Sequence, residues 1–150
     1  MERMLGLRLL EKIVHASDSL ALRLGREQPP HLELGRQGEE AAFFHLRRLG
    51  YTVVARGWRS GKAAGDLDLV AWEGNTLCFV EVKTRSSRSV ATAESAVDQD
   101  KIRALRRLAR QYLLALRDTP DQVRFDVLSI YFVGQRPAEI ELFRGAFDWH

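Results

Sequence analysis

The chain has 150 residues, 45% of them hydrophobic, which is enough for one substantial core and too little for two ordinary domains. Its 23 Lys and Arg against 20 Asp and Glu give a formal charge of only +3, so net charge alone does not identify a nucleic-acid-binding protein. The one cysteine excludes an internal disulfide and a cysteine-based metal site, and it favours a reducing cytoplasm.

The N-terminal residues 1–27 have apolar side chains at helical spacing, which predicts an amphipathic helix. Charged residues interrupt the apolar ones, so we expect neither a signal peptide nor a membrane span. Pro29 and Pro30 then favour a break. We therefore expect residues 1–33 to form a helical appendage with a linker, and residues 34–150 to form one α/β domain.

The first half of this domain is predicted to be a helix followed by three strands. The helix spans Leu34–Leu49, and Gly50 ends it. A strand over Tyr51–Ala55 precedes an exposed loop over Gly57–Gly65, where Gly, Ser and Lys gather. The Glu73-Gly74-Asn75 turn then joins strands Asp66–Trp72 and Thr76–Thr84 into an antiparallel hairpin.

The second half is predicted to be a long helix and two strands. After a loop of Ser and Arg over residues 85–90, the apolar stripe indicates a helix from about Ser95 to Arg117. Val123–Val133 and Ile140–Phe143 are rich in β-branched and aromatic residues, which favours strands.

Charged residues stand at the centre of the predicted hairpin. Because side chains alternate along a strand, Asp66 and Asp68 should share one face with Val70 and Trp72. In the partner strand, Glu81 and Lys83 share a face with Leu77 and Phe79. The pairing of the two strands can bring Asp68, Glu81 and Lys83 together, although an unpaired charge there would cost several kcal/mol or more.

Two interpretations fit this cluster. The first is an ion-pair cluster, in which Lys83 neutralises Glu81 and Asp68 at the edge of the core. The second is a site for Mg2+ or Mn2+, because hard carboxylate oxygens hold such ions and phosphodiester cleavage uses them. In that case Lys83 would orient the attacking water or offset phosphate charge, and Glu39 on the preceding helix is the candidate for a third acid.

Four runs carry a resemblance to a known family: Leu34–Ala41, Gly65–Ala71 with its Asp66-Leu67-Asp68 step, Phe79–Arg85 with its Glu81-Val82-Lys83 step, and Arg124–Val127. Together they resemble the bacterial YraN family of uncharacterised proteins over about residues 34–147. That family resembles the PD-(D/E)xK nucleases, including archaeal Holliday-junction resolvases.

The resemblance implies a restriction-endonuclease-like core, with a mixed central sheet flanked by helices. It also implies that Asp68 and Glu81 are catalytic metal-binding acids, that Lys83 is the catalytic lysine, and that Glu39 is the helix acid bound to the metal. The chain departs from the pattern at Asp66, where the family usually has Glu, and in having no Pro before the acid.

Basic residues flank the proposed site in sequence and could contact phosphate. They are Arg56, Arg59 and Lys62 before it, Arg85 and Arg88 after it, and Lys101, Arg103, Arg106 and Arg110 on the long helix. A basic run on a helix is more often only its solvated face, but this run lacks the interleaved Glu that surface pairing would use.

The sequence therefore predicts a cytoplasmic, Mg2+- or Mn2+-dependent endonuclease-like protein that acts on DNA, with branched or single-stranded DNA as its expected substrate. A homodimer is expected by analogy, because a DNA junction has two-fold symmetry. One alternative is a non-catalytic DNA-binding or repair-accessory protein of the same fold. The other is a partner-binding module that uses residues 1–27.

Overall fold

The structure is a computed structural model, and it describes residues 30–86 and 98–150. The helix predicted over residues 1–27 lies outside the described residues. The chain divides into two units, Met1–Leu32 and Glu33–His150, and the sheet belongs to the second. The described elements are α2 (Pro30–Arg48), β1 (Thr52–Ser60), β2 (Ala63–Glu73), β3 (Thr76–Arg85), α3 (Gln99–Ala115), β4 (Gln122–Tyr131) and β5 (Glu139–Phe147).

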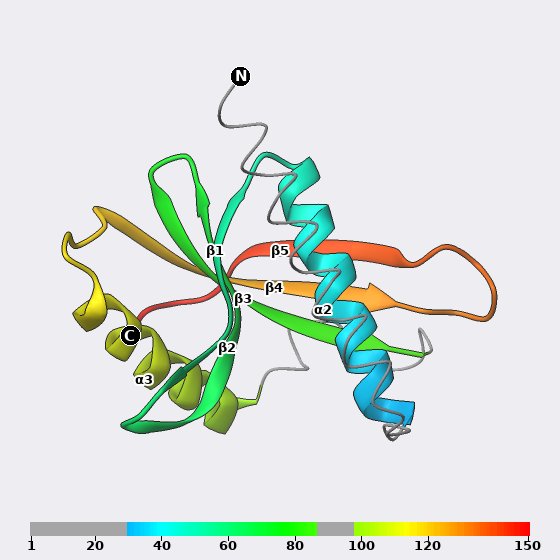
Figure 1. Cartoon of the computed structure of the whole chain (residues 1–150), viewed down its shortest axis with the longest axis horizontal. Coiled ribbons are helices and arrows are strands. Elements are labelled where there is room, and N and C mark those ends of the chain that lie inside the picture. Colours follow the sequence, from blue (N-terminus) through cyan, green and yellow to red (C-terminus); the bar gives the residue numbers. More distant parts are fainter. Residues whose placement is uncertain (1–29, 87–97) are drawn as a thin grey trace, which may run out of the picture. The chain divides into compact units, whose positions relative to one another are not determined.

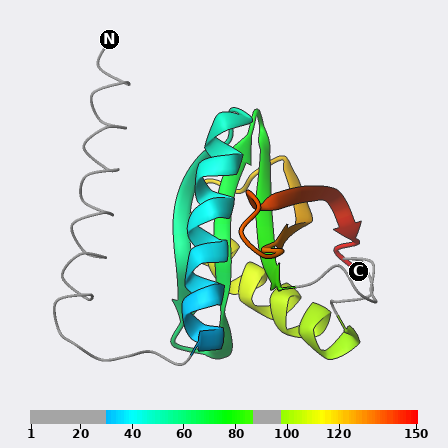
Figure 2. The ribbon, with the colours of Figure 1, turned by 90° about the vertical axis from the view of Figure 1, so that its right-hand side faces the viewer.

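The five strands form one mixed sheet in the order β1-β2-β3-β4-β5 (Figure 1). Neighbouring strands are antiparallel except β3 and β4, which are parallel and are joined through α3. The two helices cover opposite faces, and the view in Figure 2 separates α2 from α3. The predicted α/β class with a mixed sheet between helices is confirmed, and it is consistent with a restriction-endonuclease-like core.

The core has two parts, one on each face of the sheet. Under α2, buried side chains of the helix pack on buried residues of the central strands: Ala42, Phe43 and Leu46 on Leu69, Cys78, Val80, Leu128 and Ile130. Under α3 the corresponding set is Ile102, Leu105, Leu108 and Ala109 on Leu67, Val70, Leu77, Phe79, Phe125 and Val127. Strands β3 and β4 are therefore buried on both faces, so polar side chains at their centres need partners.

The first helix begins at Pro30 instead of at the predicted Leu34. Proline suits the first helical position, because its φ is already helical and its missing N–H would have no partner there. The Pro pair that we interpreted as a break and linker thus includes the residue that starts the helix.

The predicted exposed loop over Gly57–Gly65 is wrong. Strand β1 continues to Ser60 and pairs with β2 up to the contact of Ser60 with Ala63. The pairing shifts register twice, and Gly57 adopts a positive φ of 54° within the strand. Glycine and lysine gave this stretch the composition of a loop, whereas cross-strand pairing with irregular steps keeps it in the sheet.

The later elements differ from the prediction only in their ends. The described part of the long helix begins at Gln99, because the side chain of Asp98 caps it by accepting the amide of Lys101 at 2.8 Å, and it ends at Ala115 instead of Arg117. Strand β4 ends at Tyr131 instead of Val133. Strand β5 runs on to Phe147 because its pairing with β4 continues through an irregular step beside Asp126.

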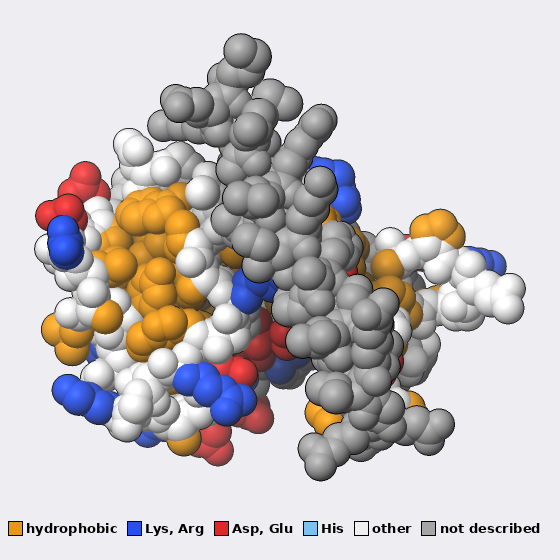
Figure 3. All heavy atoms as spheres, viewed as in Figure 1, with side chains coloured by type: hydrophobic (Ala, Val, Ile, Leu, Met, Phe, Trp, Pro, Cys, Tyr) orange, Lys and Arg blue, Asp and Glu red, His pale blue; other side chains and the backbone are white. Residues whose placement is uncertain are grey.

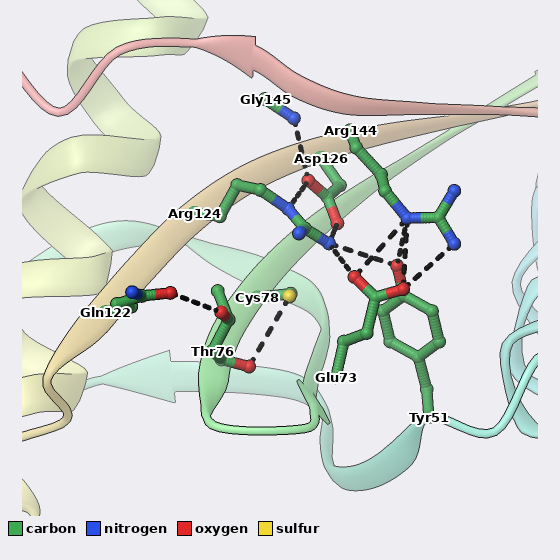
Figure 4. Close-up of polar contacts among 9 residues, drawn as sticks. All are labelled: Tyr51, Glu73, Thr76, Cys78, Gln122, Arg124, Asp126, Arg144 and Gly145. Carbon is green, nitrogen blue, oxygen red and sulfur yellow. Dashed lines mark hydrogen bonds and ion pairs between the residues drawn. The ribbon is translucent and has the colours of Figure 1, made fainter.

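A polar network ties the ends of four strands together (Figure 4). Asp126 is fully buried on β4 and accepts the Arg124 guanidinium at 2.7 and 2.9 Å and the Gly145 amide at 3.0 Å. Glu73 receives both Arg124 and Arg144, and the Tyr51 hydroxyl accepts from the same two guanidinium groups at 3.1 Å. Each acid of this network therefore has a cationic partner, which is what burial of a carboxylate requires.

Helix α2 approaches the end of β3 so closely that only glycine fits at the contact. A Cβ added at Gly38 would lie 1.9 Å from Oγ1 and 3.0 Å from Cβ of Thr84. At Gly35, on the same helix, an added Cβ meets nothing within 4 Å. Gly38 thus sets the distance between α2 and β3, and Glu39 is the next residue along the helix.

We expect Asp126→Ala to lower the free energy of unfolding by about 3–5 kcal/mol, because it leaves Arg124 partly buried without its main partner. Asp121→Ala, at an exposed position just before β4, should change it by less than about 0.5 kcal/mol. Urea unfolding followed by circular dichroism measures both. Equal effects of the two substitutions would contradict a stabilising role for the network.

A second pair of substitutions tests the contact of α2 with β3. Gly38→Ala should cost about 1–3 kcal/mol, because the methyl group overlaps Thr84 and the helix must move. Gly35→Ala should instead be neutral or stabilise by up to about 1 kcal/mol, because alanine favours the helix and the space is open. Thermal unfolding of the two variants gives the comparison, and a Gly38→Ala variant as stable as Gly35→Ala would refute the close contact.

Candidate active site

Strands β2 and β3 separate at Asp68, and the side chain of this residue takes over a backbone contact. The last residues paired between the two strands at this end are Leu69 and Val80. Beyond them, Oδ2 of Asp68 accepts the amide of Val82 at 2.8 Å. A side-chain oxygen that accepts a backbone amide of the neighbouring strand fixes the position of the carboxyl group.

Glu81 lies next to this point on β3 and is almost completely buried, with 4% of its side chain exposed. Its Oε1 atom contacts two ammonium groups, Nζ of Lys83 and Nζ of Lys101, each at 3.1 Å. Its Oε2 atom is buried and has no hydrogen-bond partner among the described residues. One oxygen of the carboxylate is thus doubly neutralised, and the other is left without a donor.

Burial and neighbouring acids raise the pKa of Asp68 and that of Glu39. Burial, followed by the charge of Glu81, raises the pKa of Asp68 to about 8, although the Val82 amide and the charge of Lys101 act in the opposite direction. On α2, burial and then the charge of Asp66 raise the pKa of Glu39, against the influence of Arg56. Carboxylates that disfavour each other's ionisation in this way gain from a nearby cation.

The structure brings Asp68, Glu81 and Lys83 together, as the hairpin predicts, but in a different way. Leu67 packs under α3 with Val70, whereas Leu69 packs under α2, so the regular alternation of β2 fails between these residues. Val70 and Trp72 share the face under α3 as predicted, but Leu67 packs there too, so the predicted common face does not extend regularly to Asp68 and Asp66. This break coincides with the point where β2 loses its pairing with β3 and remains paired with β1 alone.

Within the described residues, no three His, Cys, Asp or Glu side chains stand close enough together to hold a metal ion by themselves. Glu39 is near enough to feel the charges of Asp66 and Glu81, without joining Asp68 and Glu81 in such a group. Mg2+ commonly uses only one or two carboxylates and completes its shell with water and substrate oxygens. The unpartnered Oε2 of Glu81 beside Asp68 is a donor set that fits such an ion.

The comparison with known proteins agrees with the sequence motifs. The profile of a family described as uncharacterised protein family UPF0102 matches residues 38–130, a range that contains Glu39, Asp68, Glu81 and Lys83. The chain belongs to this family. UPF0102 is the YraN family, so the predicted family is confirmed.

Several UPF0102 proteins are similar to the chain over most of its length. One from Koribacter versatilis is 44% identical over 144 residues, which cover 95% of this chain and 92% of that protein. One from Solibacter usitatus is 46% identical over 125 residues, which cover 83% and 92%. One from a Parafrankia species is 43% identical over 114 residues, which cover 76% and 95%. No helix in residues 30–86 and 98–150 is long and apolar enough to span a bilayer.

In this UPF0102 chain the predicted phosphate-contacting residues that precede Asp68 in sequence lie on the β1–β2 hairpin. Arg59 pairs with Asp66 at 3.6 Å, and the guanidinium of Arg56 lies 4.8 Å from the centre of the Phe43 ring on α2. Lys62 is exposed in the turn. On the face viewed in Figure 3, acidic side chains lie next to Lys and Arg side chains at the border of a hydrophobic area. Positive charge thus lies around acids on that surface.

The basic residues of α3 make contacts within the protein that the sequence does not predict. Arg106 donates to the backbone carbonyls of Asp148 and His150, and the guanidinium of Arg110 lies 5.8 Å from the Trp149 ring centre. Arg103 pairs with Asp100 on the helix itself. Two of these arginines therefore hold the C-terminal segment, in addition to any contact with phosphate.

Two predicted phosphate-contacting residues follow Glu81 and Lys83 in sequence. Arg85 is the last residue of β3, and its buried Nε atom has no hydrogen-bond partner within residues 30–86 and 98–150. Arg88 lies outside the described residues.

Lys101 is the site residue whose role the sequence misses. We predicted only a phosphate contact on the long helix, whereas its ammonium lies against Glu81. The charge of Glu81, followed by those of Asp68 and Asp66, raises the pKa of Lys101 despite partial burial. No spacing rule relates residues on a strand and on a later helix, so this contact follows only from the way α3 docks.

The raised pKa of Asp68 predicts a pH dependence of stability. Between its ordinary value of 3.8 and about 8, the folded protein keeps a proton that the unfolded chain releases, so stability from this group falls as pH rises. Asp68→Asn removes the titration. Without metal, the variant should lose less stability between pH 5 and pH 9 than the wild type, by at least about 1 kcal/mol.

Urea unfolding in the presence of a chelator, at pH 5, 7 and 9, measures this difference. Asp118→Asn, at an exposed position after α3, serves as the control and should follow the wild type. Identical pH profiles for Asp68→Asn and the wild type would show that Asp68 ionises normally.

Proposed function

We propose that this UPF0102 protein is a metal-dependent nuclease that acts on DNA. The observation that carries the proposal is the pair of carboxylates where β2 and β3 separate. Asp68 is held there by the Val82 amide, and in the part of the chain that the structure describes the buried Oε2 of Glu81 has no hydrogen-bond partner. Lys83 contacts the other oxygen of Glu81 at 3.1 Å. Acids and a lysine in this arrangement are the parts that phosphodiester hydrolysis needs.

Asp68 and Glu81 are the residues that would hold Mg2+ or Mn2+, with Glu39 as the third acid of the proposal. When bound, such an ion polarises the phosphate and lowers the pKa of its water. Lys83 is positioned to orient that water or to offset charge on the phosphate. The fixed contact of Asp68 with Val82 keeps one ligand in place before substrate binds, which reduces the cost of organising the site.

A nucleic-acid partner accounts for both the acidic residues of the site and the basic residues of the neighbouring hairpin. Carboxylates at a surface repel phosphate unless a cation lies between them, whereas Arg56, Arg59 and Lys62 on the neighbouring hairpin attract it. The resemblance to Holliday-junction resolvases makes branched or single-stranded DNA the substrate to test first. A cytoplasmic location and a homodimer belong to the same proposal.

The ion pairs of Glu81 favour a second candidate. Lys83 and Lys101 neutralise this residue as an ion-pair cluster would, and a DNA-binding protein without catalysis would need no more than that. The two candidates differ in the unpartnered Oε2 of Glu81. A purely structural cluster gains nothing from leaving a buried oxygen without a donor.

We expect Asp68→Asn and Glu81→Gln each to lower the rate of Mg2+- or Mn2+-dependent cleavage by on the order of 100-fold or more, because each removes a charged ligand. Lys83→Ala should lower the rate without weakening metal binding. Labelled four-way junctions and single strands are the substrates, and gel electrophoresis measures the products. Circular dichroism melting shows whether each variant is folded.

Asp118→Asn, which is remote in sequence from all four site residues and exposed, should cleave like the wild type. If the wild type binds these DNAs and cuts none of them with either metal, the non-catalytic candidate replaces the nuclease. If Asp68→Asn and Glu81→Gln are largely unfolded, but the folded fraction of each variant cleaves DNA as fast as the wild type, the two acids have a structural role.

A further inference from the structure

Lys101 approaches the acids from a different element than Lys83 does. Lys83 is two residues from Glu81 on the same strand, so its contact with this acid is local. Lys101 belongs to the first turn of α3, yet its Nζ lies 3.1 Å from the same Oε1 atom. Its charge also lowers the pKa of Asp68. The ammonium of Lys101 therefore lies where it acts on both of the carboxylates proposed as ligands.

The backbone of Lys101 is fixed while its side chain retains freedom. Asp98 caps α3 by accepting the Lys101 amide at 2.8 Å, and Ile102 and Leu105 are buried against the sheet. The side chain of Lys101 is 36% exposed, compared with 4% for Glu81. A lysine side chain is a mobile point charge on four methylene groups, so its ammonium can leave Glu81 without movement of the helix.

The ammonium groups of Lys83 and Lys101 are an incomplete match for this site. Both contact the same oxygen of Glu81, and Oε2 is left without a donor among the described residues. A divalent cation carries twice the charge and accepts oxygens from both acids, so it competes for the same carboxylate. A divalent ion at Glu81 would also repel the two ammonium groups already there, and Lys101 is the more exposed of the two lysines and the one free to move from a separate element.

We propose that Lys101 neutralises Glu81 in place of the metal ion in the metal-free protein, and that a divalent cation displaces its ammonium from Glu81 toward the substrate phosphate. This inference rests on the proposed function. Lys101 neutralises buried Glu81 when no metal is bound and becomes available for a phosphate oxygen when metal is bound. It is a positioning residue for Glu81 in the first state and a phosphate contact in the second.

If Lys101 and a divalent cation compete for Glu81, removal of the lysine should change the affinity for metal, and this can be measured without any cleavage assay. In Lys101→Met the competing charge is absent, so Mn2+ should bind roughly three- to tenfold more tightly than to the wild type. Lys101→Arg keeps a competing charge and should bind like the wild type. Arg107→Met removes the same charge from an exposed position on α3 and should also leave the affinity unchanged.

Electron paramagnetic resonance of free Mn2+ measures binding to each full-length variant, and melting curves recorded with a chelator confirm folding. Equal or weaker binding to Lys101→Met overturns the inference and leaves the proposed function standing, provided that the wild type binds Mn2+. No binding to either protein at millimolar Mn2+ overturns both. Binding to Glu81→Gln as tight as to the wild type also overturns both, because the ion then lies elsewhere.

A second measurement follows the lysine itself. The lysines of the chain are Lys12, Lys62, Lys83 and Lys101, so 13C-dimethyl labels give few NMR signals, and Lys101→Arg assigns one of them. Mg2+ should move the Lys101 signal toward that of exposed Lys62, and Glu81→Gln should show the same position without Mg2+. A Lys101 signal unchanged by saturating Mg2+ would mean that the ion and the ammonium do not share Glu81.

Discussion

The burial of Glu81 on the central strand β3 is the constraint on which the arrangement of the site depends. Both faces of β3 are covered, and a carboxylate in such a place costs several kcal/mol unless cations approach it. Lys83 approaches from the same strand and needs no tertiary contact to be close. Lys101 reaches Glu81 only because the apolar stripe of α3 docks the first turn of the helix beside β3. Packing of the core and neutralisation of the acid thus depend on each other.

The polar clusters around Asp126 and around Glu81 differ in how completely their buried acids are paired. Around Asp126, the acids have guanidinium partners and the backbone amide of Gly145 takes part, so burial there leaves each acid satisfied. Around Glu81, one buried oxygen has no donor, and the neighbouring Asp68 has a raised pKa. Selection for stability alone would favour complete pairing in both places. An incompletely paired cluster beside a fully paired one in the same sheet is the pattern expected where function costs stability.

The sequence predicted those parts of the fold that depend on local pattern. The period of two along β3 correctly placed Glu81 and Lys83 on one face, because the parallel ladder of β3 with β4 stays regular through Arg85. The same rule failed for β2 at Asp68, where the ladder with β3 ends. The strand in place of the loop over Gly57–Gly65, and the contact of Lys101 with Glu81, both require pairing or docking between separate elements. Composition and spacing carry no information about such contacts.

The contacts of α3 also indicate which part of the surface the proposed nucleic acid would contact. Arg106 and Arg110 lie against the C-terminal segment, so their guanidinium donors are partly used within the protein. Lys101 is different, because it lies in the first turn, where the helix dipole also favours a phosphate. The β1–β2 hairpin, with Arg56 and exposed Lys62, supplies positive charge from another element. The proposed DNA partner would then be held by the start of α3 and by this hairpin, rather than along the whole basic length of the helix.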